Sequence, residues 1–280
     1  MTQAMLQTPE LSEAQFTKIS NLVKTRAGIN LHDGKRELVR SRLTKRLRQL
    51  GLDTFDQYIQ RVSMDRSGAE LTTMLDILST NLTHFFRESQ HFDFLRALAL
   101  PELMATRRSM RHIRVWSAGC SSGEEPYTLA IVLNECVPPD QGWDVRILAT
   151  DLSTQVLATA REGVYSAQRM KGTPPDLLSR YFTLTETKPE KLYKAKPAIR
   201  QMVHFARLNL MEPWPMQGPF DIIFCRNVMI YFDKPTQGQL VRRYHDVLAP
   251  GGYLFIGHSE SLTGVQHDFD YVQPTVYRKL

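Results

Sequence analysis

From residue 112 to the end of the chain, apolar runs typical of β-strands alternate with stretches typical of α-helices. The expected strands are HIRVWSA (112–118), DVRILATD (144–151), FDIIFCRN (220–227) and GYLFIGHS (252–259). Helices are expected from Glu124, from Ser153 and after Pro235. Strands that alternate with helices indicate a mostly parallel sheet covered by helices. We therefore expect a doubly wound, Rossmann-like α/β domain, closed by PTVYRKL (274–280) as an antiparallel edge strand.

The first 85 or so residues show a different pattern, that of consecutive short helices. Apolar residues recur at helical spacing, and Gly51 is suited to a helix end. Capping-box spacing marks three helix starts, at Ser12 with Gln15, Thr54 with Gln57, and Ser67 with Glu70. Segment 79–89 (STNLTHFFRES) interrupts the periodicity and precedes a further helix at about 89–105. We expect an all-α domain at 1–85 and an α/β domain at 86–280, with a core that includes Phe16, Ile19, Leu22, Val23, Leu43, Leu47 and Leu50.

A longer segment, about 166–208, separates the second and third expected strands. Its aromatic and aliphatic residues are spaced as in short strands joined by turns. We expect an excursion from the main sheet, with strands around Tyr181, Phe182 and Leu184, around Leu192 and Tyr193, and around Val203 and Phe205.

Charge is concentrated near the N-terminus. The chain of 280 residues carries a formal net charge of +6, and residues 1–64 hold 11 Lys or Arg against 6 Asp or Glu. The stretch KRELVRSRLTKRLR (35–48) contains seven basic residues and one acid, Glu37. It is either a solvated helix face or a docking surface for an acidic partner.

The composition argues against several other classes of protein. The start lacks a signal-peptide pattern and no apolar stretch is long enough to span a membrane, so we expect a cytoplasmic protein without membrane insertion. Cys120, Cys136 and Cys225 are odd in number and far apart. This spacing suggests neither a disulfide framework nor a zinc site, and we expect no metal.

The stretch SAGCSSGEEPY (117–127) is a glycine-rich turn between a strand and a helix. Such turns usually bind phosphate, because helix N-termini attract anions. Here Glu124 and Glu125 occupy the helix start, which argues against a dinucleotide. The carboxylates could simply complement the helix dipole, but a nucleoside with a cationic end, such as S-adenosylmethionine, would suit them. Asp151, at the end of the second strand, could bind its ribose or could cap the next helix.

Several motifs, in order, resemble the chemotaxis-receptor methyltransferases of the CheR type. They are STNLTHFFRE, WSAGCSSGEEPYTLA, ATD, LNL, FDIIFCRNVMIYFD and GHSESL, and the resemblance covers residues 10–280. It implies methyl transfer from S-adenosylmethionine to glutamate side chains on the cytoplasmic helical region of chemoreceptors, leaving S-adenosylhomocysteine. It also implies a small β-subdomain at 178–205 and a basic helix that docks on the receptor. The implied cofactor contacts are Asn81, Thr83, Arg87, Glu125, Asp151, Asn209, Leu210, Arg226 and Asn227.

Methyl transfer to a glutamate needs no general base, because this side chain is ionised near neutral pH. We accordingly expect positioning residues, and we assign catalytic importance to Arg87 and to Tyr231, whose ring could contact the substrate or face the sulfonium. In isolation these two would be interpreted as a surface arginine and a core tyrosine.

Two other functions stay open at this stage: a nucleic-acid methyltransferase, suggested by the basic helix, and a non-catalytic signalling module that binds the nucleoside. The residues after the third strand (RNVM) lack the pattern of amino-directed base methylation, and we expect no nucleic-acid partner. In some members of the family the β-subdomain docks a receptor C-terminal peptide through a glycine-rich loop. This chain has TLTETKPEK there, so we expect no strong binding of such a peptide.

Overall fold

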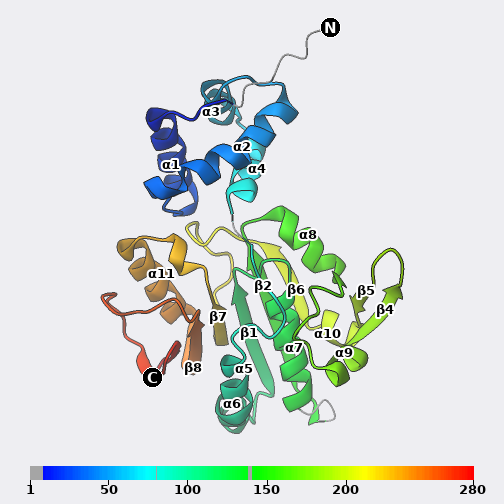
Figure 1. Cartoon of the computed structure of the whole chain (residues 1–280). Helices are drawn as coiled ribbons and strands as arrows, with labels where there is room; N and C mark the ends of the chain where they lie inside the picture. Colours follow the sequence, from blue (N-terminus) through cyan, green and yellow to red (C-terminus); the bar gives the residue numbers. More distant parts are fainter. Residues whose placement is uncertain (1–8, 80, 138–140) are drawn as a thin grey trace. The chain divides into compact units, whose positions relative to one another are not determined.

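The computed structural model describes residues 9–79, 81–137 and 141–280. Two compact units emerge (Figure 1): the helical unit, which holds the described residues up to 79 together with Tyr231–Asp233, and the α/β unit, which holds 81–230 and 234–280. Residues 1–8, at the start of the expected helical domain, and Thr80, in the expected linker, lie outside the described residues.

The helical unit contains four α-helices, α1 (Glu13–Ala27), α2 (Arg36–Leu50), α3 (Phe55–Met64) and α4 (Ala69–Leu78), and a 3-10 turn, η1 (Asp33–Lys35). Capping boxes at Ser12 and Thr54 start α1 and α3, and Gly51 ends α2, as expected from the sequence. The expected stripes form the core, except that Leu22 and Leu50 are only partly buried.

The expected capping box at Ser67 is wrong. Helix α4 begins at Ala69 with Gly68 as its N-cap, and the Glu70 carboxylate does not reach back to the cap. It instead accepts hydrogen bonds from Arg46 on α2, at 2.9 and 2.7 Å. A buried carboxylate gains more from a guanidinium than from one exposed backbone N–H, so the tertiary contact replaces the local one.

The α/β unit is built on a seven-stranded sheet in the order β6-β2-β1-β7-β8-β10-β9. Five neighbouring strands, β6, β2, β1, β7 and β8, run parallel to one another. The strands are β1 (His112–Ala118), β2 (Asp144–Asp151), β6 (Val203–Arg207), β7 (Phe220–Cys225), β8 (Leu248–Ile256), β9 (Asp270–Gln273) and β10 (Val276–Arg278).

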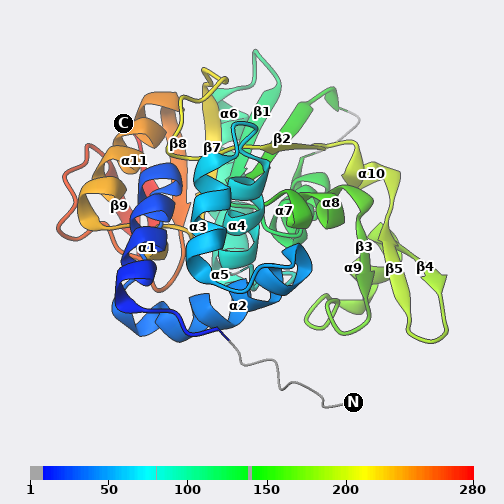
Figure 2. The same ribbon diagram turned by 90° about the horizontal axis from the view of Figure 1, so that it is seen from above.

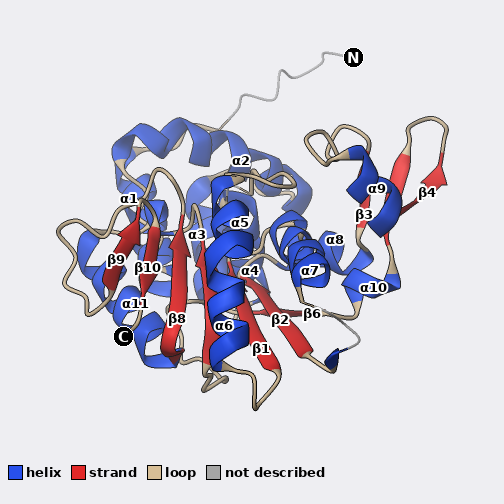
Figure 3. Cartoon of the chain, turned by 90° about the horizontal axis from the view of Figure 1, so that it is seen from below, coloured by secondary structure: helices blue, strands red, loops and turns tan. Residues whose placement is uncertain are grey.

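Helices cover both faces of this sheet. One face packs against α7 (Glu124–Cys136), α8 (Thr154–Glu162) and a continuous helical stretch made of α5 (Gln90–Phe94), the π-helical turn η2 (Leu95–Ala99) and α6 (Leu100–Thr106) (Figure 3). On the opposite face Tyr244 of α11 (Lys234–Val247) packs edge-to-face on Trp116. The α/β prediction is confirmed: a Rossmann-like sheet whose parallel strand ends lie at one edge.

The inserted region forms a second, three-stranded sheet in the order β3-β5-β4. It comprises β3 (Val164–Ser166), β4 (Phe182–Glu186) and β5 (Leu192–Ala195), flanked by α9 (Pro175–Tyr181) and α10 (Pro197–Arg200). Figure 2 shows it projecting beside α10, away from the main strands. The expectation that Val203 and Phe205 belong to this excursion is wrong, because β6 pairs with β2 in the main sheet.

The closing strand also differs from expectation. β10 is antiparallel to β8, as expected, but it is not the edge, since β9 pairs along its other side. The sequence around β9 (DYVQ) is polar and short, and carries little strand signal. Within the described residues, none of the helices has the length and apolar character needed to cross a bilayer.

Candidate functional site

The turn after β1 is tied to the end of β2. The backbone N–H groups of Gly119 and Cys120 both donate to the carbonyl of Thr150, at 2.8 and 2.9 Å. The Ser121 hydroxyl donates to the carbonyl of Asn81, at 3.1 Å. Two of the expected strand ends and the segment before α5 are therefore brought together in one place.

Asp151 stands at this junction. Its carboxylate accepts hydrogen bonds from the backbone N–H groups of Ser121, at 2.8 Å, and Ser153, at 2.9 Å. The cap of α8 is Ser153, whose hydroxyl accepts from Val156. Ser153, and not Asp151, is therefore the N-cap residue of α8, although Asp151 accepts a hydrogen bond at the start of this helix. Its bonds fix the carboxylate between two strand ends, where each oxygen can accept more than one hydrogen bond.

Arg226, directly after β7, is the charged centre of the site. Its side chain is 2% exposed and forms ion pairs with Glu88, at 3.1 Å, and Glu125, at 3.2 Å. It also donates to the carbonyl of Arg87 and lies against the rings of Phe92 and Phe224. A buried guanidinium is tolerated only when such partners compensate its desolvation.

The two acids of the glycine-rich turn have separate partners. Glu125 accepts from the Ser117 hydroxyl at 2.7 Å as well as from Arg226, and burial raises its pKa despite these bonds. Glu124 is fully buried, pairs with Arg169 and accepts a hydrogen bond from the Ser122 hydroxyl. Both carboxylates lie in the first turn of α7, where their negative charge disfavours a pyrophosphate.

The charges at the strand ends suit a cationic ligand. Arg87 and Arg226 supply two positive charges, and Glu88, Glu125 and Asp151 supply three negative ones. A net negative charge favours a sulfonium with an amino group and disfavours phosphates. Glu88 was missed by sequence reasoning, although it belongs to the quoted motif STNLTHFFRE. Its pKa is lowered, because Arg226 and hydrogen bonds outweigh the effect of burial.

The other expected contacts lie in the segment before α5 and in the turns after β6 and β7. The Arg87 guanidinium, 29% exposed, donates to the carbonyl of Leu82 at 2.8 Å, and Thr83 is partly buried nearby in the chain. Asn209 is buried and accepts from the Met211 N–H at 3.0 Å. Its neighbour Leu210 is buried, and the Asn227 amide donates to Glu88 at 3.3 Å.

Tyr231 is the exception among the expected residues. It groups with the helical unit, where its carbonyl accepts from the Asn30 N–H at 2.7 Å. Its position relative to the strand ends is therefore not defined, and its catalytic role stays a prediction.

Three metal-ligand side chains lie close together beside the cluster. Glu88, His91 and His258 have ligand atoms within 4.8 Å of one another. Glu88 is, however, engaged by Arg226, and a divalent cation there would be repelled by the guanidinium. Burial lowers the pKa of His91 to about 3, and its Nε2 is already hydrogen-bonded to the Thr275 hydroxyl at 2.6 Å. We assign no metal to this group.

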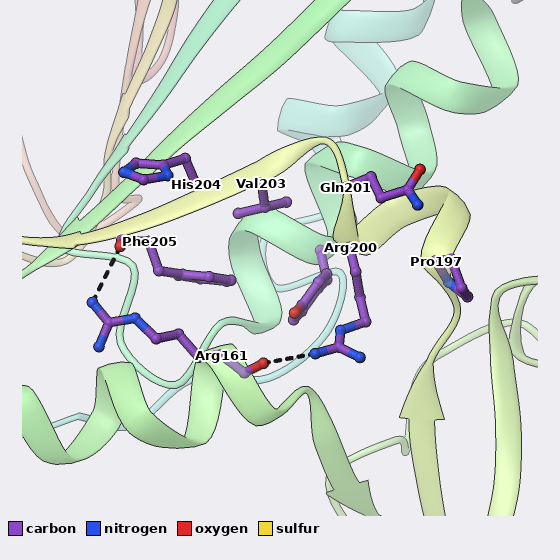
Figure 4. Close-up of a pocket in the computed structure, with 8 residues that line it drawn as sticks. Arg161, Pro197, Arg200, Gln201, Val203, His204 and Phe205 are labelled. Carbon is purple, nitrogen blue, oxygen red and sulfur yellow. Dashed lines mark hydrogen bonds between the residues drawn. The ribbon is translucent and has the colours of Figure 1, made fainter.

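Among the described residues, two cavities that we consider lie away from the strand ends. One, of about 480 Å³, lies between α7, α8, α10 and the edge strand β6 (Figure 4). In it Arg161 donates to the Phe205 carbonyl and Arg200 donates to the Arg161 carbonyl. These arginines satisfy backbone groups at a sheet edge and a helix end. The other, of about 680 Å³, lies beside α3 and α4. Neither contains an expected site residue.

Comparison with known proteins agrees with the motifs. Residues 14–79 match the all-alpha domain of CheR methyltransferase, and residues 81–278 match its SAM-binding domain. The chain is similar to the chemotaxis protein methyltransferase of Salmonella typhimurium, with 42% identity over 98% of this chain and 92% of the relative. For the Escherichia coli protein of the same description the values are 41%, 99% and 95%. A probable chemotaxis protein methyltransferase of Rhizobium etli is 40% identical over 92% of this chain and 96% of the relative. The chain belongs to the CheR methyltransferase family and uses S-adenosylmethionine as its cofactor.

Proposed function

We propose that this methyltransferase transfers the methyl group of S-adenosylmethionine to glutamate side chains of chemoreceptors, forming glutamyl methyl esters. The observation that carries the proposal is the near full-length similarity to chemotaxis protein methyltransferases. The charge balance of the strand ends supports it, because net negative charge and buried carboxylates suit the cationic cofactor.

The chain's own residues need only bind and position. When bound, the cofactor supplies an electrophilic methyl group on a positively charged sulfur. The residues proposed to hold it are Asn81, Thr83, Arg87, Glu125, Asp151, Asn209, Leu210, Arg226 and Asn227. The acceptor glutamate is already ionised near neutral pH, which accounts for a site without a general base. Arg87, whose guanidinium is partly exposed, is proposed to orient the acceptor carboxylate, and Tyr231 to line the reacting atoms.

The partner surface is proposed to be α2. Of the seven basic residues in 35–48, six lie on α2 and Lys35 ends the preceding turn η1. Arg40 pairs with Glu37 at 2.7 Å. Arg42 donates to the carbonyls at the end of α4, and Arg46 pairs with Glu70, so both stabilise the helical unit. Lys35, Arg36, Lys45 and Arg48 are exposed. We propose that these four face the acidic methylation region of the receptor.

Transfer of labelled methyl groups to a cytoplasmic receptor fragment tests the proposal. Label that is released by mild alkali is expected, because methyl esters hydrolyse under these conditions while methylated amines do not. Alkali-stable label, or uptake that depends on added RNA, would favour a different acceptor. Binding of S-adenosylhomocysteine without any transfer would indicate a signalling module.

The small sheet is proposed not to dock a receptor tail. Its strands β4 and β5 are joined by residues 187–191, which are exposed and contain no glycine. Calorimetric titration of the C-terminal receptor peptide should show no strong binding. A tight complex would show that a loop without glycine supports this docking.

A further inference from the structure

Glu260, in the quoted motif GHSESL, is a buried carboxylate that the expected site does not include. It is 8% exposed. No Lys, Arg or His of the described ranges 9–79, 81–137 and 141–280 forms an ion pair with it. A buried charge without a counter-ion is costly unless hydrogen bonds replace the lost water. The groups that donate hydrogen bonds to Glu260 therefore indicate its role in the structure.

Its carboxylate accepts hydrogen bonds from backbone N–H groups in two turns. One oxygen accepts from Asn227, at 3.0 Å, and from Gly257, at 2.6 Å, and the other accepts from Ile230, at 3.1 Å. Asn227 and Ile230 follow β7, whereas Gly257 follows β8. The carboxylate thus joins the turns at the ends of two adjacent parallel strands.

The same two turns pack too closely for a larger residue. A Cβ atom on Gly257 would lie 2.5 Å from the Asn227 amide nitrogen and 2.8 Å from its backbone nitrogen. On the other side of the 227–230 turn, a Cβ on Gly119 would lie 2.3 Å from a methyl group of Val228. The turn after β7 is therefore enclosed between the turns after β1 and β8.

Asn227 also has an unusual backbone conformation, with φ of 57°. For a residue other than glycine, this left-handed conformation costs energy and persists only where the surroundings enforce it. The hydrogen bond from its N–H to Glu260 and the contact with Gly257 supply that constraint. Its side chain then reaches Glu88, and Arg226 precedes it at the centre of the site.

We propose that Glu260 is a positioning residue, whose carboxylate locks the 227–230 turn against the turn after β8 and thereby sets the positions of Arg226 and Asn227 for the cofactor. The inference rests on the proposed role of these two residues in holding S-adenosylmethionine. Glu260 acts through them and does not itself touch the reacting atoms.

The test compares Glu260→Gln with Asp221→Asn. Glutamine keeps the shape but presents an NH₂ group to a backbone donor, so at least one amide loses its partner. Asp221 is a matched control: it is 3% exposed, accepts from Arg107 and from the Arg114 N–H, and lies at the opposite end of β7. Affinity for S-adenosylhomocysteine is measured by calorimetry and melting temperature by scanning calorimetry.

Glu260→Gln should weaken S-adenosylhomocysteine binding by about tenfold or more, the usual effect of losing a hydrogen bond to a charged group. The KM for S-adenosylmethionine should rise in parallel. Asp221→Asn should lower the melting temperature and leave the affinity unchanged. Unchanged affinity in Glu260→Gln, or an equal loss in Asp221→Asn, would overturn the proposal.

Hydrogen exchange of the wild-type protein provides a readout that does not depend on the variant's folding. Without cofactor, the amides of Asn227 and Ile230 should exchange far more slowly than those of the exposed loop 187–191. Exchange as fast as in that loop would contradict a preformed lock. Because the binding, melting and hydrogen-exchange measurements need no receptor, they stand even if the wild-type protein binds the cofactor but methylates no glutamate.

Discussion

Helix α2 and the strand-end cluster use the same residue type in opposite ways. On α2, Arg36 and Arg48 are exposed and have room to reach a partner. At the strand ends, Arg226 is 2% exposed and is held by two carboxylates, a carbonyl and two aromatic rings. We therefore expect a change of charge on α2 to affect association with the receptor. A change of charge at Arg226 should affect both the stability of the fold and the affinity for the cofactor.

The difference lies in desolvation. Exposed ion pairs contribute about 0 to 1 kcal/mol and are screened by salt, whereas removing one partner of a buried pair leaves a charge that water cannot reach. Arg46 shows that a position on α2 does not by itself make an arginine exposed. Its pair with Glu70 is largely shielded, so reversing its charge would test stability more than docking.

The largest effect is expected for Arg226→Met. It leaves Glu88 and Glu125 without their shared cation, and should lower the free energy of unfolding by about 3 to 5 kcal/mol and abolish S-adenosylhomocysteine binding. Arg114→Met is the matched control, because its pair with Asp144 is 33% and 48% exposed, and it should cost no more than about 1 kcal/mol. Urea unfolding measures both. Equal losses of unfolding free energy in the two variants would contradict the expected difference between a buried and an exposed arginine.

A smaller effect on stability is expected from His91. This side chain is buried against Glu88, Arg226 and His258, and its Nε2 forms a hydrogen bond with the Thr275 hydroxyl. Its pKa of about 3 lies below that of an unfolded histidine, near 6.5, so the unfolded chain binds the proton first as pH falls. Stability should therefore decrease from about pH 6.5 downwards, by about 2 kcal/mol at pH 5 from this group.

Urea unfolding at pH 8 and pH 5 measures this linkage. His91→Gln should show a pH dependence weaker by that amount. An unchanged pH dependence in His91→Gln would show that another group is responsible for the loss of stability at low pH.

The smallest effect on stability is expected for the exposed charges. Lys45→Glu with Arg48→Glu should change the free energy of unfolding by less than about 0.5 kcal/mol and leave cofactor affinity intact. Receptor methylation should nevertheless fall roughly tenfold at low salt, with less difference at high salt.

The control for docking reverses Arg66 and Arg242, which are exposed and lie outside α2. Their reversal should leave methylation nearly unchanged. A comparable loss in this control would mean that net charge, and not α2, determines the rate.

Local patterns predicted much of the fold. The strands at 112–118 and 144–151 and the helix starts at Ser12, Thr54 and near Ser153 all depend on neighbours in the chain. Glu70 and β6 were misassigned because contacts distant in sequence decide them: Arg46 for the first and the edge of β2 for the second.

In the candidate site, too, local sequence patterns identified some residues and missed those whose partners are distant in the chain. Asp151, Glu125 and Arg226 could be found because they follow apolar runs, and the structure brings them together. Glu88 and Glu260 could not be assigned from spacing, although both lie in quoted motifs, because their partners are Arg226 and the backbone of a turn 30 or more residues away in the chain.

The most direct test of the central claim is tandem mass spectrometry of a receptor's cytoplasmic fragment after incubation with the wild-type protein and S-adenosylmethionine. The predicted result is the mass of one methyl group on specific glutamate side chains, removed by mild alkali and absent with Arg226→Met. Methylation of any other residue type, or an unmodified receptor beside a protein that binds the cofactor, would contradict the claim.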